Sequence, residues 1–341
     1  MKKNVYRLGT ILLLTLVFLY FFFRKVEWKE VLNNLVDIDF KFFILLILLV
    51  PLHFVTRSIR WDFLLKHEKR GIKFYNRFAA NAVGFTVTFL FPGRLGEVAK
   101  PFYLAQKEKV SRGFTLGTIV VERIFDLFTM CCLLGLFMLS RLFFPAYFRA
   151  PEEAYSNLQM WGIIGSALAF LLLVVSFSLY FFRERTLSVL SFLLRPFPEK
   201  VSQSIIKASL SFIQGLKFFH SVGDLLAYIM LSFVVWIGII FFYWIFFLAY
   251  NLSVPFYILF PYVFFTMVGA SIPTPGMVGG FHYFSKLGLT SFFNIGTNLA
   301  VGMTIVVHAV QLMVTCLIGY VILWKEGISL FQLRKIGEDV K

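Results

Sequence analysis

Long apolar stretches alternate with short polar segments along the whole chain. Six of the apolar stretches are continuous and long enough for a membrane-spanning helix: residues 7–24, 41–59, 113–139, 159–182, 223–250 and 298–324. A helix needs about 20 predominantly apolar residues to cross the hydrocarbon core of a bilayer, which is roughly 30 Å thick. The pattern therefore predicts an all-α polytopic membrane protein with six full transmembrane helices in a single membrane domain, residues 1–341.

Two further apolar stretches, about residues 75–106 and 256–290, are interrupted by proline and glycine. The first break reads Phe91-Pro92-Gly93-Arg94-Leu95-Gly96-Glu97, and the second reads Pro273-Thr274-Pro275-Gly276-Met277-Val278-Gly279-Gly280. Broken helices are tolerated at membrane depth only where the freed backbone groups are buried in protein or line a wet cavity. We therefore expect two re-entrant broken-helix hairpins, a feature typical of a transporter's binding site.

The distribution of lysine and arginine favours this re-entrant topology. If both interrupted stretches return to the side from which they enter, one side carries 25 Lys and Arg residues and the other carries 6. A full crossing by residues 75–91 would move the basic segment 92–113 to the other side and reduce this asymmetry. Because cytoplasmic loops are enriched in Lys and Arg, we expect a multi-pass protein of the cell (cytoplasmic) membrane with both termini in the cytoplasm.

The predicted topology repeats itself. Two crossings, a hairpin and a third crossing occur in residues 7–139 and again, starting from the opposite side, in residues 159–324. This is an inverted-topology repeat, which suits alternating access. Residues 183–222 contain amphipathic segments and are expected to form a cytoplasmic linker along the membrane surface, and residues 325–341 a cytoplasmic tail.

Composition and charge exclude several other classes of protein. The chain is 59% hydrophobic and 19% aromatic, which excludes a water-soluble domain. The net charge of +15 lies in short segments between apolar stretches and comes with no nucleic-acid-binding motif, so we expect anionic membrane lipids as partners and no nucleic acid. The cysteines and histidines have no metal-binding spacing, and no cofactor motif is present. The oligomeric state stays open.

Three charged residues lie inside the third predicted crossing, where each costs about 2.5–3.5 kcal/mol on insertion scales. Glu122 and Asp126 share one face of the helix, and Arg123 reaches Asp126 from three positions away. Two carboxylates on one face require an external cation or a shared proton. The cluster predicts the lining of a polar cavity, and the alternative is an internal ion cluster that only joins helices.

Arginine also accompanies the first break and the second crossing. Arg94, with Gly96 and Glu97, stands beside the start of a half-helix, where a cation and free backbone N–H groups suit a phosphate. The alternative is an arginine that extends from an ordinary loop to the membrane surface. Arg57 and Arg60 lie one turn apart at the inner end of the second crossing. We expect them to be positive-inside anchors, and recruitment of an anionic headgroup is the alternative.

The second break carries neither arginine nor carboxylate, yet it contains two prolines and three glycines. A purely structural kink hardly requires so many, so a substrate-binding site is favoured over a kink. The residues that the break and the following helix offer to a substrate are Thr274, Pro275, Gly276, Gly279, His282 and Lys286.

Four motifs, in this order, resemble those of the lysylphosphatidylglycerol synthase transmembrane, or flippase-like, family. They are Arg57-x-x-Arg60-Trp61, Pro92-Gly-Arg94-Leu-Gly96-Glu97, Glu122-Arg123-x-x-Asp126 and Pro273-Thr-Pro275-Gly276-x-x-Gly279. The resemblance covers about residues 5–325. In the multiple peptide resistance factor of this family, the membrane domain moves an aminoacylated phospholipid between leaflets and a separate cytosolic domain makes that lipid. The resemblance implies a lipid-translocating membrane domain here.

The sequence departs from the family at two points. The family's second break commonly continues as PTPGGxGxxE, whereas this chain has Met277 at the second glycine and His282 near the glutamate. The synthase half has no counterpart, so we expect no enzyme activity. We predict a flippase-like lipid translocase for an anionic phospholipid or a polyprenyl-phosphate-linked lipid. The alternative is a membrane subunit or lipid-handling partner of a separate cytosolic aminoacyl- or glycosyl-transferase.

Overall fold

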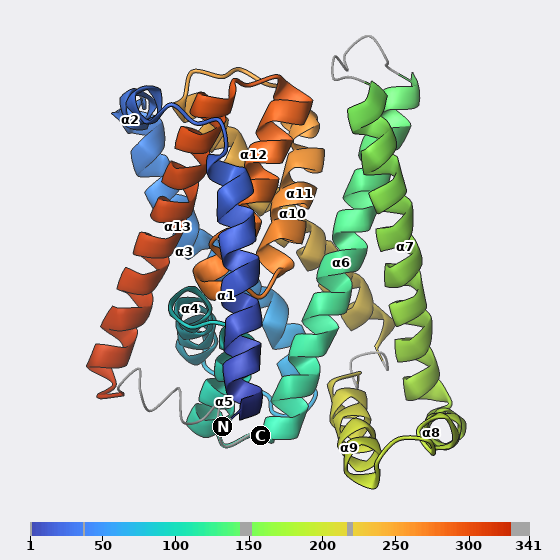
Figure 1. Ribbon diagram of the computed structural model, residues 1–341. Helices are drawn as coiled ribbons and strands as arrows, with labels where there is room; N and C mark the ends of the chain where they lie inside the picture. The colour runs from blue at the N-terminus through green and yellow to red at the C-terminus, as the bar shows by residue number, and fades with distance from the viewer. Residues whose placement is uncertain (1, 37, 144–151, 217–220, 329–341) are drawn as a thin grey trace.

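The computed structural model describes residues 2–36, 38–143, 152–216 and 221–328, and the regular elements in these segments are all helices (Figure 1). Six of them are long: α1 (Lys2–Phe23), α3 (Phe40–Leu65), α6 (Arg112–Phe143), α7 (Glu152–Phe181), α10 (Val222–Ala249) and α13 (Thr297–Lys325). They coincide with the six predicted crossings, and the all-α prediction is confirmed. In the described parts of the chain, four segments are long and apolar enough to cross a membrane: Phe40–Leu65, Gly162–Phe181, Val222–Ala249 and Thr297–Lys325.

Each proline-glycine break separates two short helices that pack against each other. The first pair is α4 (Phe74–Leu90) with α5 (Gly96–Glu108), and the second is α11 (Leu259–Ser271) with α12 (Gly280–Phe293). The four helices have 17, 13, 13 and 14 residues, so at 1.5 Å per residue none is as long as a bilayer core is thick. The α4–α5 pair lies in the half of the bundle where α1 begins, and the α11–α12 pair lies in the other half (Figure 1).

The two breaks share one local feature, a glycine and a following residue that both have positive φ values. In the first, Gly93 and Arg94 have φ values of 78° and 56°, and in the second, Gly276 and Met277 both have a φ of 59°. These values lie in the left-handed region, which glycine adopts without strain and other residues seldom adopt. In both breaks the Pro-Gly-X sequence thus places the glycine and the residue after it in the left-handed region.

Glycines also allow the two helices of each pair to approach closely. A methyl group at Gly84 of α4 would lie 2.6 Å from Cβ of Lys100 on α5. A methyl group at Gly269 of α11 would lie 2.8 Å from Cβ of Phe284 on α12. Contacts this short leave no room for a side chain at either glycine. Glycines thus allow the two helices to pack closely in both pairs.

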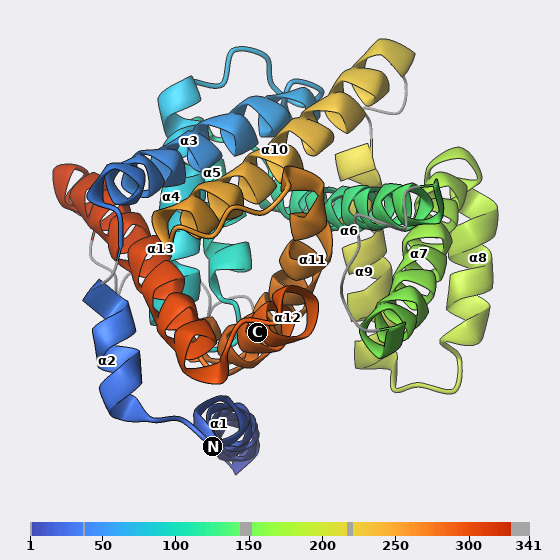
Figure 2. The ribbon, with the colours of Figure 1, turned by 90° about the horizontal axis from the view of Figure 1, so that it is seen from above.

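The helices around the centre pack in corresponding ways (Figure 2). Helix α3 packs on α10, α4 packs on α13, and α6 contacts α11. Helix α5 contacts α6 as α12 contacts α13. The outer helices differ, since α1 packs on α12 whereas α7 packs on α6. Elements α3 to α6 therefore make nearly the same set of contacts as α10 to α13.

The remaining helices lie at the two ends of the bundle. Helix α2 (Trp28–Val36) packs on α13 near its start, and α8 (Arg183–Leu193) and α9 (Glu199–Gly215) lie at the end where α1 begins (Figure 1). Two single-turn 3₁₀ helices, η3 (Phe256–Ile258) and η4 (Pro275–Met277), flank α11. Helix α13 also ends at this end of the bundle, where α1 begins (Figure 1). Of the predicted linker and tail, residues 217–220 and 329–341 lie outside the described residues.

Candidate functional site

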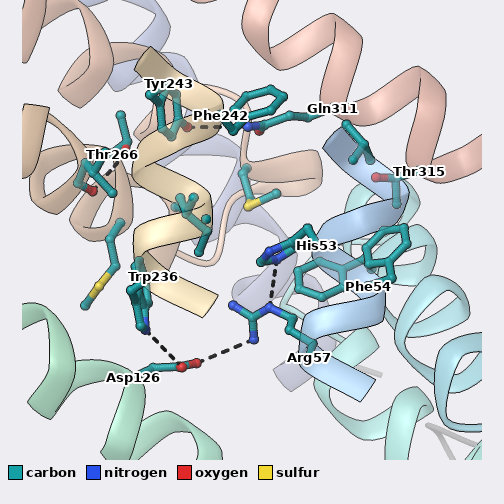
Figure 3. A pocket seen from close by; sticks show the side chains of 18 of the residues that line it. His53, Phe54, Arg57, Asp126, Trp236, Phe242, Tyr243, Thr266, Gln311 and Thr315 are labelled. Carbon is teal, nitrogen blue, oxygen red and sulfur yellow. Dashed lines mark hydrogen bonds and ion pairs between the residues drawn. The ribbon is translucent and has the colours of Figure 1, made fainter. Parts of the chain in front are cut away.

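A cavity of about 550 Å³ lies between the two helix pairs, and its wall combines an apolar surface with a charged end (Figure 3). Its sides come from α3, α4, α6, α10, α11 and α13, and both breaks contribute residues. The apolar lining includes Leu49, Phe85, Phe89, Ile239, Phe242 and Met267. The charged residues that line the cavity are Arg57, Arg94, Glu97, Arg123 and Asp126. Such a wall matches a molecule with one charged and one apolar part.

Asp126 is the centre of the charged end. Its carboxylate lies 2.6 Å from Nη1 of Arg60, 3.2 Å from Nη2 of Arg123 and 3.6 Å from Nη1 of Arg57. The Trp236 indole donates a hydrogen bond of 3.1 Å to the same carboxylate (Figure 3). The predicted contact between Arg123 and Asp126 is confirmed. Arginines from two helices and a tryptophan from α10 therefore surround one carboxylate.

The negative charge of Glu122 is compensated by cations from two other helices, α5 and α3. Glu122 is fully buried, and Nζ of Lys100 on α5 lies 2.5 Å from its Oε2. Nη2 of Arg60 lies 3.7 Å from its Oε1. Lys100 also lies 4.2 Å from the ring of Trp61, whose indole donates a 2.9 Å hydrogen bond to Thr118. The expected external cation or shared proton is therefore wrong, because the protein supplies its own cations to both carboxylates.

The network extends from this buried part to an open part at the first break. Arg94 contacts Glu97 at 3.0 Å, and Arg123 lies 3.9 Å from the same carboxylate. The side chains of Arg94, Glu97 and Arg123 are 28%, 35% and 36% exposed. A ligand that enters the cavity therefore meets these three side chains and needs no rearrangement of the buried pairs.

Arg57 and Arg60 are buried inside the protein, which contradicts the expectation that their side chains extend to a membrane surface as anchors. They are only 4% and 0% exposed. Burial of two arginines requires opposite charge, which Asp126 and Glu122 provide. His53 accepts a 2.7 Å hydrogen bond at its Nε2 from Nε of Arg57 (Figure 3). This bond orients the Arg57 guanidinium toward the cavity.

The residues expected at the second break do not join this network. Thr274, Gly276 and His282 are buried, and Nε2 of His308 lies 2.9 Å from the carbonyl oxygen of Gly276. The His282 and His308 rings are 4.6 Å apart, and Oγ1 of Thr274 has no hydrogen-bond partner. Pro275 forms the first residue of η4. The second break contributes Met277 to the cavity wall.

Two of the expected residues in this region contact α1. A methyl group at Gly279 would lie 3.0 Å from the carbonyl oxygen of Thr15. Nζ of Lys286 donates hydrogen bonds of 3.0 and 2.7 Å to the carbonyls of Phe21 and Phe22, at the end of α1. A lysine satisfies the free carbonyls of a helix C-terminus well. At the first break, Gly96 lies in the close crossing with Gly84.

Sequence reasoning missed three residues of the charged end: Lys100, His53 and Trp236. Lys100 had a signal, because it is a cation in an apolar segment one helical turn after Glu97. His53 stands one turn before Arg57, which is a weaker signal of the same kind. Trp236 lies in the uniformly apolar α10, where nothing in the local pattern distinguishes it from its neighbours.

The fold and the site define a helical, multi-pass membrane protein with a charged cavity between two broken-helix pairs. The chain belongs to the family of lysylphosphatidylglycerol synthase TM regions, whose profile matches residues 8–319. It is also 22% identical, over 331 residues, to a UPF0104 membrane protein of Methanocaldococcus jannaschii. That similarity covers 94% of this chain and 95% of the archaeal protein. The resemblance to this family is thus confirmed.

Proposed function

We propose that this protein is a lipid translocase that moves an anionic lipid between the leaflets of the cell membrane. The amphipathic cavity carries the proposal, since an arginine-lined end adjoins an apolar wall inside a protein of a membrane-domain family. Arg57, Arg94 and Arg123 bind the headgroup, and the apolar wall shelters the first part of the lipid chains. Arginine suits this role because its planar guanidinium matches phosphate oxygens in bidentate geometry.

The two helix pairs are re-entrant hairpins in this proposal, and the six long helices cross the bilayer with both termini in the cytoplasm. Three observations support the assignment. The pairs lie in opposite halves of the bundle (Figure 1), and one helix of each pair, α5 or α11, has only 13 residues, too few to span. The backbone of the second break also touches α4, because a methyl group at Gly276 would lie 2.8 Å from the carbonyl oxygen of Phe89. The cavity then lies near the middle of the membrane.

The corresponding contacts of α3–α6 and α10–α13 support an inverted repeat with alternating access. In such a protein, two conformations of similar packing open the central site to opposite leaflets. The Pro-Gly-X sequence with its two positive φ values and the close glycine crossing, both present in each hairpin, favour this equivalence. The outer helices α1 and α7 stand outside the equivalent part.

Leaflet exchange in proteoliposomes tests the function directly. The purified protein is reconstituted with a nitrobenzoxadiazole-labelled anionic phospholipid, and dithionite quenching follows its movement from the inner to the outer leaflet. Arg94→Gln and Glu122→Gln are each expected to lower the exchange rate at least tenfold, because each removes a charge from the network around the headgroup.

Arg112→Gln is the matched control, because Arg112 is an exposed arginine on the same helix as Glu122. Its exchange rate should equal that of the parent. An exchange rate for the parent no higher than that of protein-free liposomes would reject the proposed function. Equal rates for the parent and both site variants would remove these residues from the mechanism.

A further inference from the structure

The charged network also identifies the kind of headgroup that it fits. Building on the proposed function, we propose that the lipid ends in a phosphomonoester, which is a dianion at neutral pH, and not in a phosphodiester. A lipid phosphate of this kind carries its charge on one terminal group next to an apolar body. The argument rests on the charges of the network, on its unpaired donors and on the apolar wall.

The ion pairs join eight residues into one network whose charges do not balance. Its cations are Arg57, Arg60, Arg94, Lys100 and Arg123, and its carboxylates are Glu97, Glu122 and Asp126. Five positive and three negative charges leave an excess of +2. Buried or half-buried charge without a partner is costly, so the network favours a ligand that supplies the two missing negative charges.

One of the two excess charges faces the cavity, because three arginines and two carboxylates line it, and the other belongs to Arg60, Lys100 and Glu122 behind that wall. Lys100 and Arg60 are used in the buried pairs with Glu122 and Asp126, at 2.5 and 2.6 Å. Arg57 Nη1, Arg94 Nε and Arg123 Nε donate no hydrogen bond, and the same is true of Arg60 Nε and Nη2. Arg57, Arg94 and Arg123 line the cavity. A phosphate in the cavity would therefore lie beside three guanidinium groups whose hydrogen-bonding capacity the protein does not fill.

A phosphomonoester fits this arrangement better than a phosphodiester does. A terminal phosphate carries close to two negative charges at pH 7 and presents three acceptor oxygens. A phosphodiester carries one negative charge and has two free oxygens, so it leaves one cation and one donor group unmatched. Charge-assisted hydrogen bonds are about twice as strong as neutral ones, so this difference affects affinity.

The apolar wall distinguishes a lipid phosphate from a free phosphate ion. Leu49, Phe85, Phe242 and Met267 surround the cavity beside its charged end, and they offer nothing to a small hydrated anion. They do offer contact to a hydrocarbon chain attached to the phosphate. We therefore expect the lipid phosphate to bind and inorganic phosphate to compete with it poorly.

A binding titration tests the inference without relying on transport. Detergent-purified protein is titrated with dioleoyl phosphatidate, a phosphomonoester, and with dioleoyl phosphatidylglycerol, a phosphodiester with the same chains. Trp236 donates to Asp126 at the site, so tryptophan fluorescence reports occupancy, and Trp236→Phe identifies its share of the signal. At pH 7.5 we expect at least tenfold tighter binding of phosphatidate. Equal affinities would overturn the inference.

The pH dependence gives an independent test. The second pKa of a phosphomonoester is about 6, so lowering the pH from 7.5 to 5.0 converts most of the dianion to the monoanion. The affinity for phosphatidate should then fall about tenfold relative to that for phosphatidylglycerol, which has no second ionisation. His53 and the carboxylates Glu97 and Asp126, which line the same cavity, act on both lipids, so the ratio isolates the ligand. A ratio that is constant with pH would contradict the inference.

Charge variants complete the test. Arg94→Gln lowers the excess to +1, and because the Arg94 side chain is 28% exposed the variant is expected to fold. Its preference for phosphatidate should fall below threefold, whereas Arg112→Gln should keep the parent's preference.

Inorganic phosphate that displaces the lipid at equal concentration would also overturn the inference. If phosphatidate binds with this preference but no leaflet exchange occurs, the proposed function fails and the inference stands. If leaflet exchange occurs but phosphatidate is not preferred, the inference fails and the proposed function stands.

Discussion

At the scale of single residues, the decisive feature is how the buried charges are matched. Lys100 and Glu122 come from different helices and form the closest ion pair at the buried end of the network, at 2.5 Å. Both side chains are almost fully buried. Such a pair adds little net stability over a well-packed apolar pair, but each partner alone is strongly destabilising. The pair therefore fixes α5 against α6.

A double-mutant cycle checks this coupling. Lys100→Met leaves Glu122 with only the more distant Arg60, so we expect a loss of about 3–5 kcal/mol of stability. That loss corresponds to a decrease of about 10 °C in the midpoint of thermal unfolding in detergent. Glu122→Gln should cost less, because the amide still accepts from Lys100. The double variant should be clearly more stable than the sum of the two losses predicts. Additive losses would show that the two residues are not coupled.

At the scale of elements, the helix pairs depend on glycines that let their backbones approach. The crossing of α4 and α5 places Gly84 and Gly96 against each other, and the crossing of α11 and α12 does the same with Gly269 and Gly280. Any side chain at these positions would separate the helices. The role of Gly96 in this crossing is structural, and it positions Arg94 and Glu97 at the cavity.

Alanine substitutions at two glycines distinguish the role of glycine in the close helix crossing from its low helix propensity. Gly96→Ala inserts a methyl group into the backbone of Gly84, so a loss of at least 2 kcal/mol is expected. Gly135→Ala is the control, because Gly135 lies inside α6 with nothing within 4 Å of the added methyl group. Since alanine favours helices over glycine, this variant should gain roughly 0.5–1 kcal/mol. Thermal unfolding measures both, and a neutral Gly96→Ala would contradict the crossing.

At the scale of the whole molecule, ion pairs between distant elements join helices at the end where α1 begins. Lys66 pairs with Asp224 at 2.6 Å, and Lys69 pairs with Glu108 at 2.8 Å. Lys107 pairs with Glu326 at 2.9 Å, and Tyr103 donates to the same carboxylate. These contacts tie α3 to α10, the α3–α4 connection to α5, and α5 to the end of α13. If the protein works by the proposed alternating access, we expect these pairs to hold this end of the protein closed.

Glu108 shows why these pairs persist at neutral pH. Burial raises the pKa of its carboxyl group, but hydrogen bonds from Lys69, Asn76 and the backbone N–H of Lys73 outweigh burial, so the pKa lies below its ordinary value. A carboxyl group with a lowered pKa in the folded state stabilises the fold above its unfolded pKa of about 4.3. That contribution is lost as the pH falls through the folded value.

Cysteine labelling tests whether these pairs close the end. Leu95→Cys places a thiol at the first break, in a background where Cys131, Cys132 and Cys316 are serine. Glu326→Gln then removes the pairing with Lys107, which is worth about 0.4–1 kcal/mol for a partly exposed pair. Labelling by a membrane-impermeant maleimide from this side should rise about two- to fivefold. Glu199→Gln, an exposed substitution at the same end, should leave it unchanged. Equal labelling of the Leu95→Cys protein with and without Glu326→Gln or Glu199→Gln would show that these pairs do not close the end.

The sequence predicted the parts of the fold that depend on whether a segment is apolar enough to lie in lipid or polar enough to lie in water. Helix α10, with 28 residues and a single acidic residue, could only be an apolar spanning segment. The two Pro-Gly-X sequences predicted helix breaks because proline cannot continue a helix and glycine accepts a positive φ. The site was predictable only in part. Arg123 and Asp126 are three positions apart and were paired correctly, whereas Arg60 and Asp126 are separated by 66 positions.

The sequence by itself determined which segments are apolar, where two of them break and which charged side chains enter the apolar region, because these properties depend on local composition. Only the tertiary structure decided that Lys100 from α5 and Arg60 from α3 compensate Glu122 and Asp126, and that Lys286 binds the end of α1. Charges at membrane depth must find partners, but the chain brings those partners together from helices that no local pattern relates.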